Sequence, residues 1–269
     1  MPRTIVVTGA SSGVGLAAAK RFAEQGDQVV VVGRDPGRLG AAMAEIRAAA
    51  TGPEPAEFQA DFEVLDDVRR LAEGLLAYPS IDVLANNAGG MVPKYRRTVD
   101  GFEATIQSNH LAPFLLTNLV KDRLSGGRVV NTASDAHRRN NLDPGDLVGA
   151  ADRYSSWRTY GAGKASNILF AAEAARRWPD ILSVSFHPGV VRSNFGSGAA
   201  TKFFYKYAPF LVTPEKAGDL LVWLATTPAA ELTDGGYYVG HKLTEPDRKA
   251  GDPAMAERLW EASAKAVGL

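Results

Sequence analysis

Short apolar runs rich in valine and isoleucine alternate along the chain with segments in which apolar residues recur at helical spacing. The apolar runs are TIVVTG, QVVVVG, IDVLANN, GRVVNTAS, ILSVSFHPG and GYYVG, with AEFQAD as a less apolar seventh. Runs of this kind are typical of strands buried in a parallel sheet. The segments with helical spacing are residues 14–25, 36–50, 63–77, 100–123 and 158–178. The alternation predicts an α/β fold, a Rossmann-like doubly wound parallel sheet of about seven strands with helices on both faces.

Two of the expected helices carry clear start signals. Asp35 precedes Pro36, and Thr213 precedes Pro214, which suits the N-cap and the first helical position. The chain has no repeat, low-complexity tract or linker, so we expect a single dinucleotide-binding catalytic domain over residues 1–269. The least regular stretches, 136–156 and 194–212, are expected to be a rim insertion and a substrate lid.

Composition narrows the possible functions. Lys plus Arg and Asp plus Glu number 30 each, and the basic pairs are dispersed, so nucleic acid is not an expected partner. The chain has no cysteine, and its four histidines lack metal-ligand spacing, so we expect no metal site. The first apolar run is too short for a signal peptide or a membrane span. These features predict a cytoplasmic protein without stable membrane insertion.

A glycine-rich turn follows the first expected strand. In VTGASSGVG, Gly9, Gly13 and Gly15 lie between a strand and a helix, where bare backbone can approach a pyrophosphate and the helix N-terminus favours its charge. The alternative is that the glycines only form a tight turn. The candidate cofactor-binding residues here are Gly9, Ser11, Ser12, Gly13, Val14 and Gly15.

The end of the second expected strand bears on the choice between NAD and NADP. An acid there would bind the ribose 2′-hydroxyl of NAD, but this chain has Gly33 followed by Arg34, a permanent cation suited to a 2′-phosphate. We therefore expect NADP(H), with NAD(H) possible. Arg34 could equally be a solvated surface residue, and Ser12 stands where a second basic residue would have strengthened the preference.

A tyrosine and a lysine share one helix face. Tyr160 and Lys164 are four residues apart, and a nearby ammonium favours the phenolate of a group whose ordinary pKa is near 10. Ser134 ends the preceding strand, at the edge where doubly wound sheets bind ligands, and its hydroxyl can donate to a substrate oxygen. Taken singly, a tyrosine–lysine pair of this spacing is often only exposed on a helix surface, and a serine at a strand end is often only a cap or turn residue. Gly161 and Gly163 cost the helix roughly 1 kcal/mol each relative to alanine, which favours a close approach of this helix to its neighbours.

Several motifs together resemble the short-chain dehydrogenase/reductase family. They are TGASSGVG, NNAG at 86–89, Asn109, Ser134, Tyr160 with Lys164, and HPGVV at 187–191, in the family's order and approximate spacing. The likeness runs through nearly the whole chain. Segments such as QSNHLAPFLLTNLV and SSWRTYGAGKASNILFA are most similar to the retinol-dehydrogenase-like and protochlorophyllide-reductase-like branch.

The resemblance implies a role for each matching residue. Tyr160 would be the general acid or base, Ser134 would position the substrate oxygen, and Lys164 would assist the tyrosine and bind the nicotinamide ribose. The further cofactor contacts that it implies are Asp61 and Phe62 at the adenine, Asn86 and Ala88 at the adenosine ribose, Pro188, and Val191 and Ser193 at the carboxamide.

Asn109 is the fourth candidate catalytic residue, and the sequence gives it an independent reason. Pro113 lies four residues later and has no N–H group, so it cannot donate to the Asn109 carbonyl. In the family the corresponding carbonyl holds a water of a proton relay. The alternative is a helix kink with no chemical role.

The aromatic segment SNFGSGAATKFFYKYAPFLVT is expected to form the lid and to favour a small apolar carbonyl or alcohol substrate, although it could instead be a partner or membrane surface. No histidine is expected to pair with an acid, so all four are interpreted as structural. The predicted function is hydride transfer between NADP(H) and an apolar carbonyl or alcohol, with association into a homo-oligomer possible. The alternatives are an inactive dinucleotide-binding sensor or scaffold, and a sugar-nucleotide epimerase or dehydratase, which the glycine spacing disfavours.

Overall fold

The computed structural model of the protein describes residues 2–191 and 211–269. Its strands are β1 (Thr4–Thr8), β2 (Gln28–Gly33), β3 (Ala56–Gln59), β4 (Val83–Asn86), β5 (Arg128–Thr132), β6 (Leu182–His187), β7 (Tyr237–Val239) and β8 (Lys242–Leu243). Its α-helices are α1 (Gly13–Glu24), α2 (Pro36–Ala49), α3 (Leu65–Leu75), α4 (Ala104–Ile106), α5 (Ala112–Leu119), α6 (Ser156–Arg177), α8 (Pro214–Thr226) and α9 (Pro253–Val267). Shorter helical turns are the π-helical η1 (Gln107–Leu111) and the 3₁₀ turns η2 (Lys121–Arg123), η3 (Asp135–Arg139), η4 (Ala151–Arg153) and η5 (Ala229–Glu231).

Within the described residues the strands form one eight-stranded sheet in the order β3-β2-β1-β4-β5-β6-β7-β8. The first seven are parallel, and only β8 runs antiparallel to its neighbour β7. The seven predicted strands and the doubly wound fold are confirmed. The eighth strand was missed because its two residues, Lys242 and Leu243, are exposed and too short to give a pattern. The strand order reverses between β1 and β4, which is the place where open α/β sheets bind ligands.

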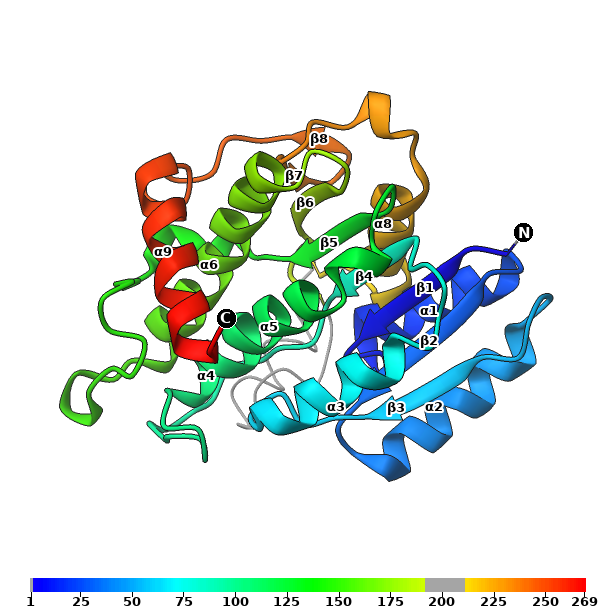
Figure 1. Ribbon diagram of the computed structural model, residues 1–269, viewed down its shortest axis with the longest axis horizontal. Coiled ribbons are helices and arrows are strands. Elements are labelled where there is room, and N and C mark those ends of the chain that lie inside the picture. Colours follow the sequence, from blue (N-terminus) through cyan, green and yellow to red (C-terminus); the bar gives the residue numbers. More distant parts are fainter. Residues whose placement is uncertain (1, 192–210) are drawn as a thin grey trace.

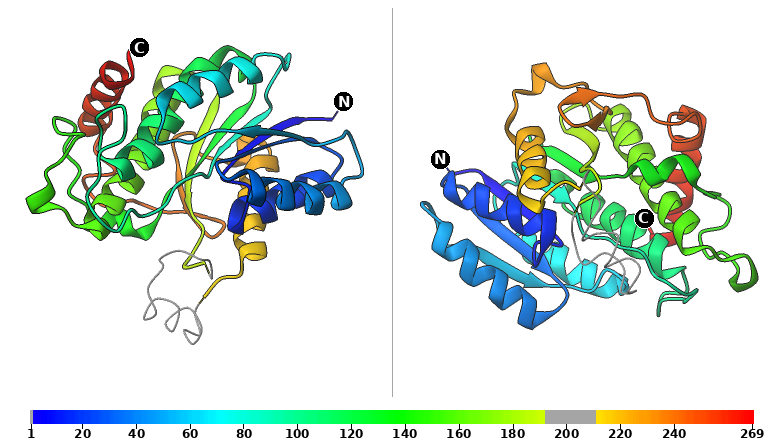
Figure 2. Two further views of the ribbon diagram at one scale, coloured as in Figure 1. Left: turned by 90° about the horizontal axis from the view of Figure 1, so that it is seen from below. Right: turned by 180° about the vertical axis from the view of Figure 1, so that it is seen from behind.

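Helices cover both faces of the sheet. Helices α3, α5, α6 and α9 lie on the face turned toward the viewer in Figure 1, and α1, α2 and α8 lie on the other face, seen in the right view of Figure 2. Each layer encloses its own apolar core against the buried strands. Because both faces are covered, the carboxyl ends of the parallel strands and the turns that follow them are left to form a site.

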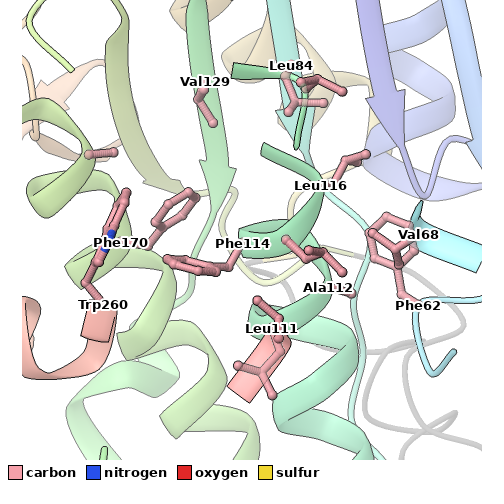
Figure 3. Packing of buried hydrophobic residues seen from close by; sticks show 14 of the residues in the cluster. Phe62, Val68, Leu84, Leu111, Ala112, Phe114, Leu116, Val129, Phe170 and Trp260 are labelled. Atoms are coloured by element: carbon pink, nitrogen blue, oxygen red, sulfur yellow. The ribbon is translucent and has the colours of Figure 1, made fainter. Parts of the chain in front are cut away.

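An aromatic cluster fixes the helices behind the candidate site. The ring of Phe114 on α5 lies 5.4 Å from that of Phe170 on α6 and 5.0 Å from that of Trp260 on α9, both edge-on (Figure 3). Such pairs stabilise a core beyond the area they bury. His110 on η1 joins the same region through a 2.8 Å contact between its Nε2 and the Ser263 hydroxyl on α9. The C-terminal helix therefore holds η1, α5 and α6 together.

Both predicted helix caps are confirmed. The Asp35 carboxylate accepts the N–H group of Arg38 at 2.8 Å, and the Thr213 hydroxyl accepts that of Lys216 at 3.3 Å. Pro36 and Pro214 occupy the first helical positions, where a missing N–H group costs nothing.

The single helix predicted over residues 100–123 is wrong. A turn at Gly101, with φ of +89°, precedes α4, and a π-helical turn at 107–111 separates α4 from α5, which ends at Leu119. In this turn the N–H group of Ala112 donates to the carbonyl of Gln107, five residues back. Pro113 follows directly, so an α-helical bond to Asn109 is impossible there, and the backbone takes up one extra residue.

The two irregular stretches are described unequally. Residues 136–156 run from η3 through η4 to the start of α6 without a strand. The predicted lid at 194–212 lies outside the described residues except for Leu211 and Val212. The N–H group of Val212 donates to Val190 at 3.0 Å, and Val212 forms a parallel bridge with Val191. The chain therefore leaves and re-enters the described structure at one point beside the end of β6.

Candidate active site

A cleft of about 520 Å³ opens at the carboxyl edge of the sheet, where the strand order reverses. Of the residues predicted to bind the cofactor, those that line it are Gly9, Ser11, Ser12, Val14, Arg34, Asp61, Phe62, Ala88 and Val191. Those that do not line it are Gly13, Gly15, Asn86, Pro188, Tyr160 and Lys164, and Ser193 lies outside the described part of the chain. The cleft therefore runs along the carboxyl ends of β1, β2, β3 and β4 and reaches Val191, after β6.

The three glycines of the turn have different structural reasons. Gly13 has φ of +58°, and a Cβ there would meet no atom within 4 Å, so it needs glycine for its conformation and leaves the N-terminus of α1 uncovered. A Cβ on Gly15 would lie 2.6 Å from the Gly9 carbonyl, and one on Gly9 would lie 2.7 Å from Ala88 Cα. Gly9 and Gly15 thus bring α1, β1 and β4 into close contact.

These residues fit the diphosphate of a nicotinamide dinucleotide. Ser12, the N-cap residue of α1, makes no side-chain cap bond, so the first N–H groups of the helix point toward the turn without a capping oxygen. A helix N-terminus with this exposed backbone favours an anion.

The side chain of Asn86 does not line the cleft. Its side chain is buried and donates to the Thr117 hydroxyl and to Asn131 Oδ1, both at 3.0 Å, inside the helix layer. The next residue, Asn87, lines the cleft instead. Its amide donates to the Thr8 carbonyl at 3.0 Å and so fixes the glycine turn to the end of β4. The Asn86 side chain therefore points away from the cleft, and the place of Asn86 beside the adenosine ribose stays a prediction.

Two arginines border the cleft beyond β2. Arg34, which is 65% exposed, lies 3.5 Å from Glu63 and 3.8 Å from Asp61. Arg96 also pairs with Glu63, at 2.5 Å. Glu63 therefore divides its negative charge between two arginines and neutralises Arg34 only in part. Arg38, in the first turn of α2, lines the cleft as well. Arg38 was missed in the sequence analysis. It lies three residues after the cap residue Asp35, in the first turn of α2, and this turn follows closely on the end of β2.

Lys164 is the buried cation of the site. Its ammonium donates to the Thr132 carbonyl at the end of β5, at 3.1 Å, and lies 5.4 Å from the centroid of the Tyr160 ring. Burial lowers the Lys164 pKa to about 8. The structure thus brings the predicted tyrosine and lysine together at the carboxyl edge of the sheet.

Ser134 follows Thr132 by two residues and opens the turn η3. Its hydroxyl oxygen accepts the N–H group of Ala136 at 3.2 Å, which leaves the hydroxyl hydrogen available to another acceptor. The turn packs against α6 at the residue after Tyr160, because a Cβ on Gly161 would lie 2.5 Å from the Ala136 carbonyl oxygen. Ser134 and Tyr160 therefore come from segments in direct contact.

Asn109 lies in the π-helical turn on the other side of α6. Its side-chain N–H groups donate to the carbonyls of Thr105, at 2.9 Å, and Gly90, at 2.8 Å. A Cβ on Gly163 would lie 3.1 Å from Asn109 Cβ, so this second helix glycine allows η1 to pack against α6. A Cβ on Gly89 would collide with Asn109 Oδ1 and lie 3.3 Å from the Lys164 ammonium. Asn109 and Lys164 therefore approach the same backbone position.

Two of the four histidines, all of them interpreted as structural, lie near a carboxylate. His187 Nε2 lies 3.6 Å from Asp135, and His137 Nε2 lies 3.8 Å from Asp247. Burial lowers the pKa of both imidazoles, and the carboxylates oppose that shift. No local pattern predicts these contacts, since 52 and 110 residues separate the partners. His110 is fully buried, and burial lowers its pKa to about 3, which fits a structural role.

Neither a group of three side chains suited to a metal ion nor a helix long and apolar enough to cross a membrane occurs in residues 2–191 and 211–269.

The sheet, the glycine turn at its switch point and the Tyr160–Lys164 pair define a Rossmann-type dinucleotide-binding protein with a tyrosine–lysine site. The sequence profile described as short chain dehydrogenase matches residues 3–202. The chain therefore belongs to the short-chain dehydrogenase/reductase family of oxidoreductases, and its relatives place it in the retinol-dehydrogenase-like branch.

Two relatives and two crystal structures illustrate this placement. A candidate daunorubicin C-13 ketoreductase, DnrU, of Streptomyces sp. (strain C5) is 51% identical, over 99% of this chain and 93% of its own. Retinol dehydrogenase 12 of Homo sapiens is 33% identical, over 99% of this chain and 87% of its own. A protein from Mycobacterium paratuberculosis superposes with a TM-score of 0.81 at 31% identity, over 99% and 93%. A short chain dehydrogenase from Burkholderia cenocepacia J2315, in complex with NADP, superposes with a TM-score of 0.70 at 26% identity, over 88% of this chain and 95% of its own.

Proposed function

We propose that the protein transfers hydride between NADP(H) and an apolar carbonyl or alcohol, with Tyr160 as the general acid or base. The observation that carries this proposal is the buried ammonium of Lys164, held beside the Tyr160 ring at the sheet edge that also bears Ser134. Burial of a cation is costly, and the family's oxidoreductase chemistry gives this one a use. The relatives named for a ketoreductase and for retinol dehydrogenases fit a carbonyl or alcohol substrate.

Each residue has one task in this mechanism. Bound NADPH supplies the hydride for the substrate carbonyl carbon. Ser134 donates its hydroxyl hydrogen to the carbonyl oxygen and orients it, and Tyr160 then gives its phenolic proton to the same oxygen. The Lys164 ammonium stabilises the negative charge left on the phenol oxygen. We infer that Asn109, whose backbone carbonyl cannot be bonded by Pro113, helps to return a proton through water, as the family resemblance implies.

The proposal is tested by following NADPH oxidation by the wild-type protein with a panel of apolar ketones, aldehydes and quinones. We expect turnover with at least one class. Tight NADPH binding without any turnover would favour the alternative of an inactive sensor. The lack of cysteine suits a reducing compartment, and a cytoplasmic location is part of the same proposal.

The preference for NADP rests on Arg34 and Arg38. Both line the cleft beyond β2, where the adenosine ribose would lie, and Arg96 shares the neutralisation of Glu63. Replacing Arg34 and Arg38 by alanine should raise the KM for NADPH by about 10- to 100-fold, because a hydrogen bond to a charged group contributes about 1.5–3 kcal/mol. The KM for NADH should stay unchanged in the same steady-state assays.

The matched control for this prediction is Arg47→Ala. Arg47 lies at the far end of α2 and pairs with Glu54, so its loss should leave both KM values alone. Equal changes in the KM for NADPH and NADH in the double variant would contradict the assignment of Arg34 and Arg38 to the 2′-phosphate.

The preference for an apolar substrate rests on Trp157. It stands three and seven residues before Tyr160 and Lys164, hence on the same face of α6. Its ring lies 6.2 Å from that of Tyr160 and is tilted by 37°, and 49% of the residue is exposed. Lys164 lies on the buried side of Tyr160, toward β5, and Trp157 lies on its solvent side. We expect the body of the substrate to bind on this solvent side.

Replacing Trp157 by alanine should raise the KM for a bulky aryl ketone by about 3- to 10-fold, because an aromatic contact contributes ~0.5–1.5 kcal/mol. The KM for a small aliphatic ketone should hardly change, and kinetics with the two substrates measure the difference. The control is Leu76→Ala, an exposed apolar residue after the C-terminus of α3, at the opposite edge of the sheet. A Trp157 variant that affects both ketones equally would contradict a contact with the substrate body.

A further inference from the structure

His137 is a fully buried imidazole between Ser134 and the segment that precedes α9. We propose that His137 is a positioning residue that holds Ser134 in place by linking its backbone to the turn at Asp247. This inference rests on the proposed function, because Ser134 matters there as the donor to the substrate oxygen. The observations that carry it are the hydrogen bonds of both ring nitrogens.

The first link joins His137 to Ser134. The Ser134 carbonyl oxygen accepts the backbone N–H group of His137 at 3.0 Å and lies 2.7 Å from its Nδ1. Since a carbonyl oxygen can only accept, Nδ1 must carry the hydrogen. One residue thus makes two hydrogen bonds to the carbonyl of the serine that faces the substrate.

The second link joins His137 to Asp247, 110 residues later in the chain. The N–H group of Asp247 donates to His137 Nε2 at 3.2 Å, so this nitrogen must be without hydrogen. The two partners together fix the neutral tautomer with hydrogen on Nδ1. Burial, which lowers the His137 pKa, agrees with this neutral form.

The turn at Asp247 is itself anchored. The Asp247 carboxylate accepts the N–H groups of Lys249, at 2.8 Å, and Ala250, at 3.2 Å, and Ala250 is buried in the core. The imidazole also packs edge-on against the ring of Tyr237 on β7, 5.1 Å away. His137 therefore connects Ser134 to fixed parts of the fold.

The turn η3 is confined from the side of α6 as well, where Gly161 packs against the carbonyls of Ala136 and Arg139. The hydroxyl of Ser134 accepts the N–H group of Ala136 within this turn. A shift of the turn would therefore move the Ser134 hydroxyl relative to Tyr160. Misplacement of a reacting group by about 1 Å can cost about 10²-fold in rate.

Two matched substitutions separate the links. In His137→Asn the amide can place its N–H group near the position of Nδ1 and keep the bond to Ser134, whereas in His137→Gln the longer side chain reaches toward Asp247 instead. His137→Asn keeps the bond to Ser134 and loses only the anchor at Asp247, so we expect it to lower kcat less than His137→Gln does. His137→Gln should lower kcat by about tenfold or more, as for a displaced reacting group, with an unchanged KM for NADPH.

A double-mutant cycle shows whether His137 acts through Ser134. In a Ser134→Ala background, the His137→Gln substitution should not lower the residual kcat further. Thermal unfolding of both His137 variants is measured alongside. An equal loss of kcat in both backgrounds, or losses that follow the melting temperature alone, would overturn the proposal.

A readout without turnover keeps this inference distinct from the proposed function. Amide hydrogen exchange at residues 135–139 should be faster in His137→Gln than in His137→Asn. If the wild-type protein reduces no carbonyl, the proposed function fails, and the exchange rates still decide whether His137 holds the turn. Equal exchange in the two variants would overturn its positioning role.

Discussion

Replacing Tyr160 by phenylalanine is expected to lower kcat by about 10²–10⁴-fold, the usual contribution of a positioned general acid or base. The substitution removes only the phenol oxygen. The ring keeps its place beside the Lys164 ammonium and the Trp157 ring, so the packing of α6 should not change. Single-turnover reduction of the best carbonyl from the panel measures the loss in the chemical step.

The control for this variant is cofactor binding. The phosphate turn at Gly13 and the arginine side chains beyond β2 lie outside the reach of the substitution, so NADPH should bind with an unchanged Kd in a fluorescence titration. A Tyr160→Phe protein with wild-type turnover would refute Tyr160 as the proton donor. A variant that loses NADPH binding in parallel would instead show a role for the phenol in holding the cofactor.

Periodicity and turn chemistry were enough to predict most of the fold. Six of the seven parallel strands are apolar because helices cover both of their faces, whereas β3, at the edge of the sheet, alternates between half-buried and exposed residues. The caps at Asp35 and Thr213 could be predicted because each signal lies within four residues. The strand β8 could not, since a two-residue exposed edge strand has no periodic pattern.

The helix at 100–123 shows where local rules fall short. Pro113 rules out an α-helical bond to the Asn109 carbonyl, but it did not reveal that the backbone would respond with a π-helical turn. That response depends on what surrounds the turn, including Gly163 of α6 and Ser263 of α9 by way of His110. Those contacts join residues 54 and 153 positions apart, which no local pattern contains.

The candidate site divides in the same way. The tyrosine, the lysine and the glycine turn have fixed spacings along the chain, so a resemblance could find them. Arg38 and Asn87 are defined by what they face across the cleft, and Asn86 was assigned to it although its side chain points into the helix layer. The partners of His137 lie on separate strands and turns, and only the folded structure brings them together.

Replacing Gly161 by alanine is expected to lower both the free energy of unfolding and kcat. A Cβ there would lie 2.5 Å from the carbonyl oxygen of Ala136 and 3.1 Å from that of Arg139. Both are backbone atoms, so the clash can be relieved only by moving η3 away from α6. Overpacking of this kind costs about 1–3 kcal/mol, against a gain of roughly 1 kcal/mol from alanine in a helix. Because Ser134 is the N-cap residue of η3, the same displacement should reduce kcat.

Gly40→Ala is the matched control for this last prediction, since Gly40 also lies inside a helix but a Cβ there would meet no atom within 4 Å. It should raise the free energy of unfolding by about 0.4–1 kcal/mol and leave kcat alone. Denaturant unfolding and steady-state kinetics of the two variants therefore separate helix propensity from packing at the site. If Gly161→Ala were as stable and active as Gly40→Ala, the close approach of η3 and α6 would not be what requires glycine beside Tyr160.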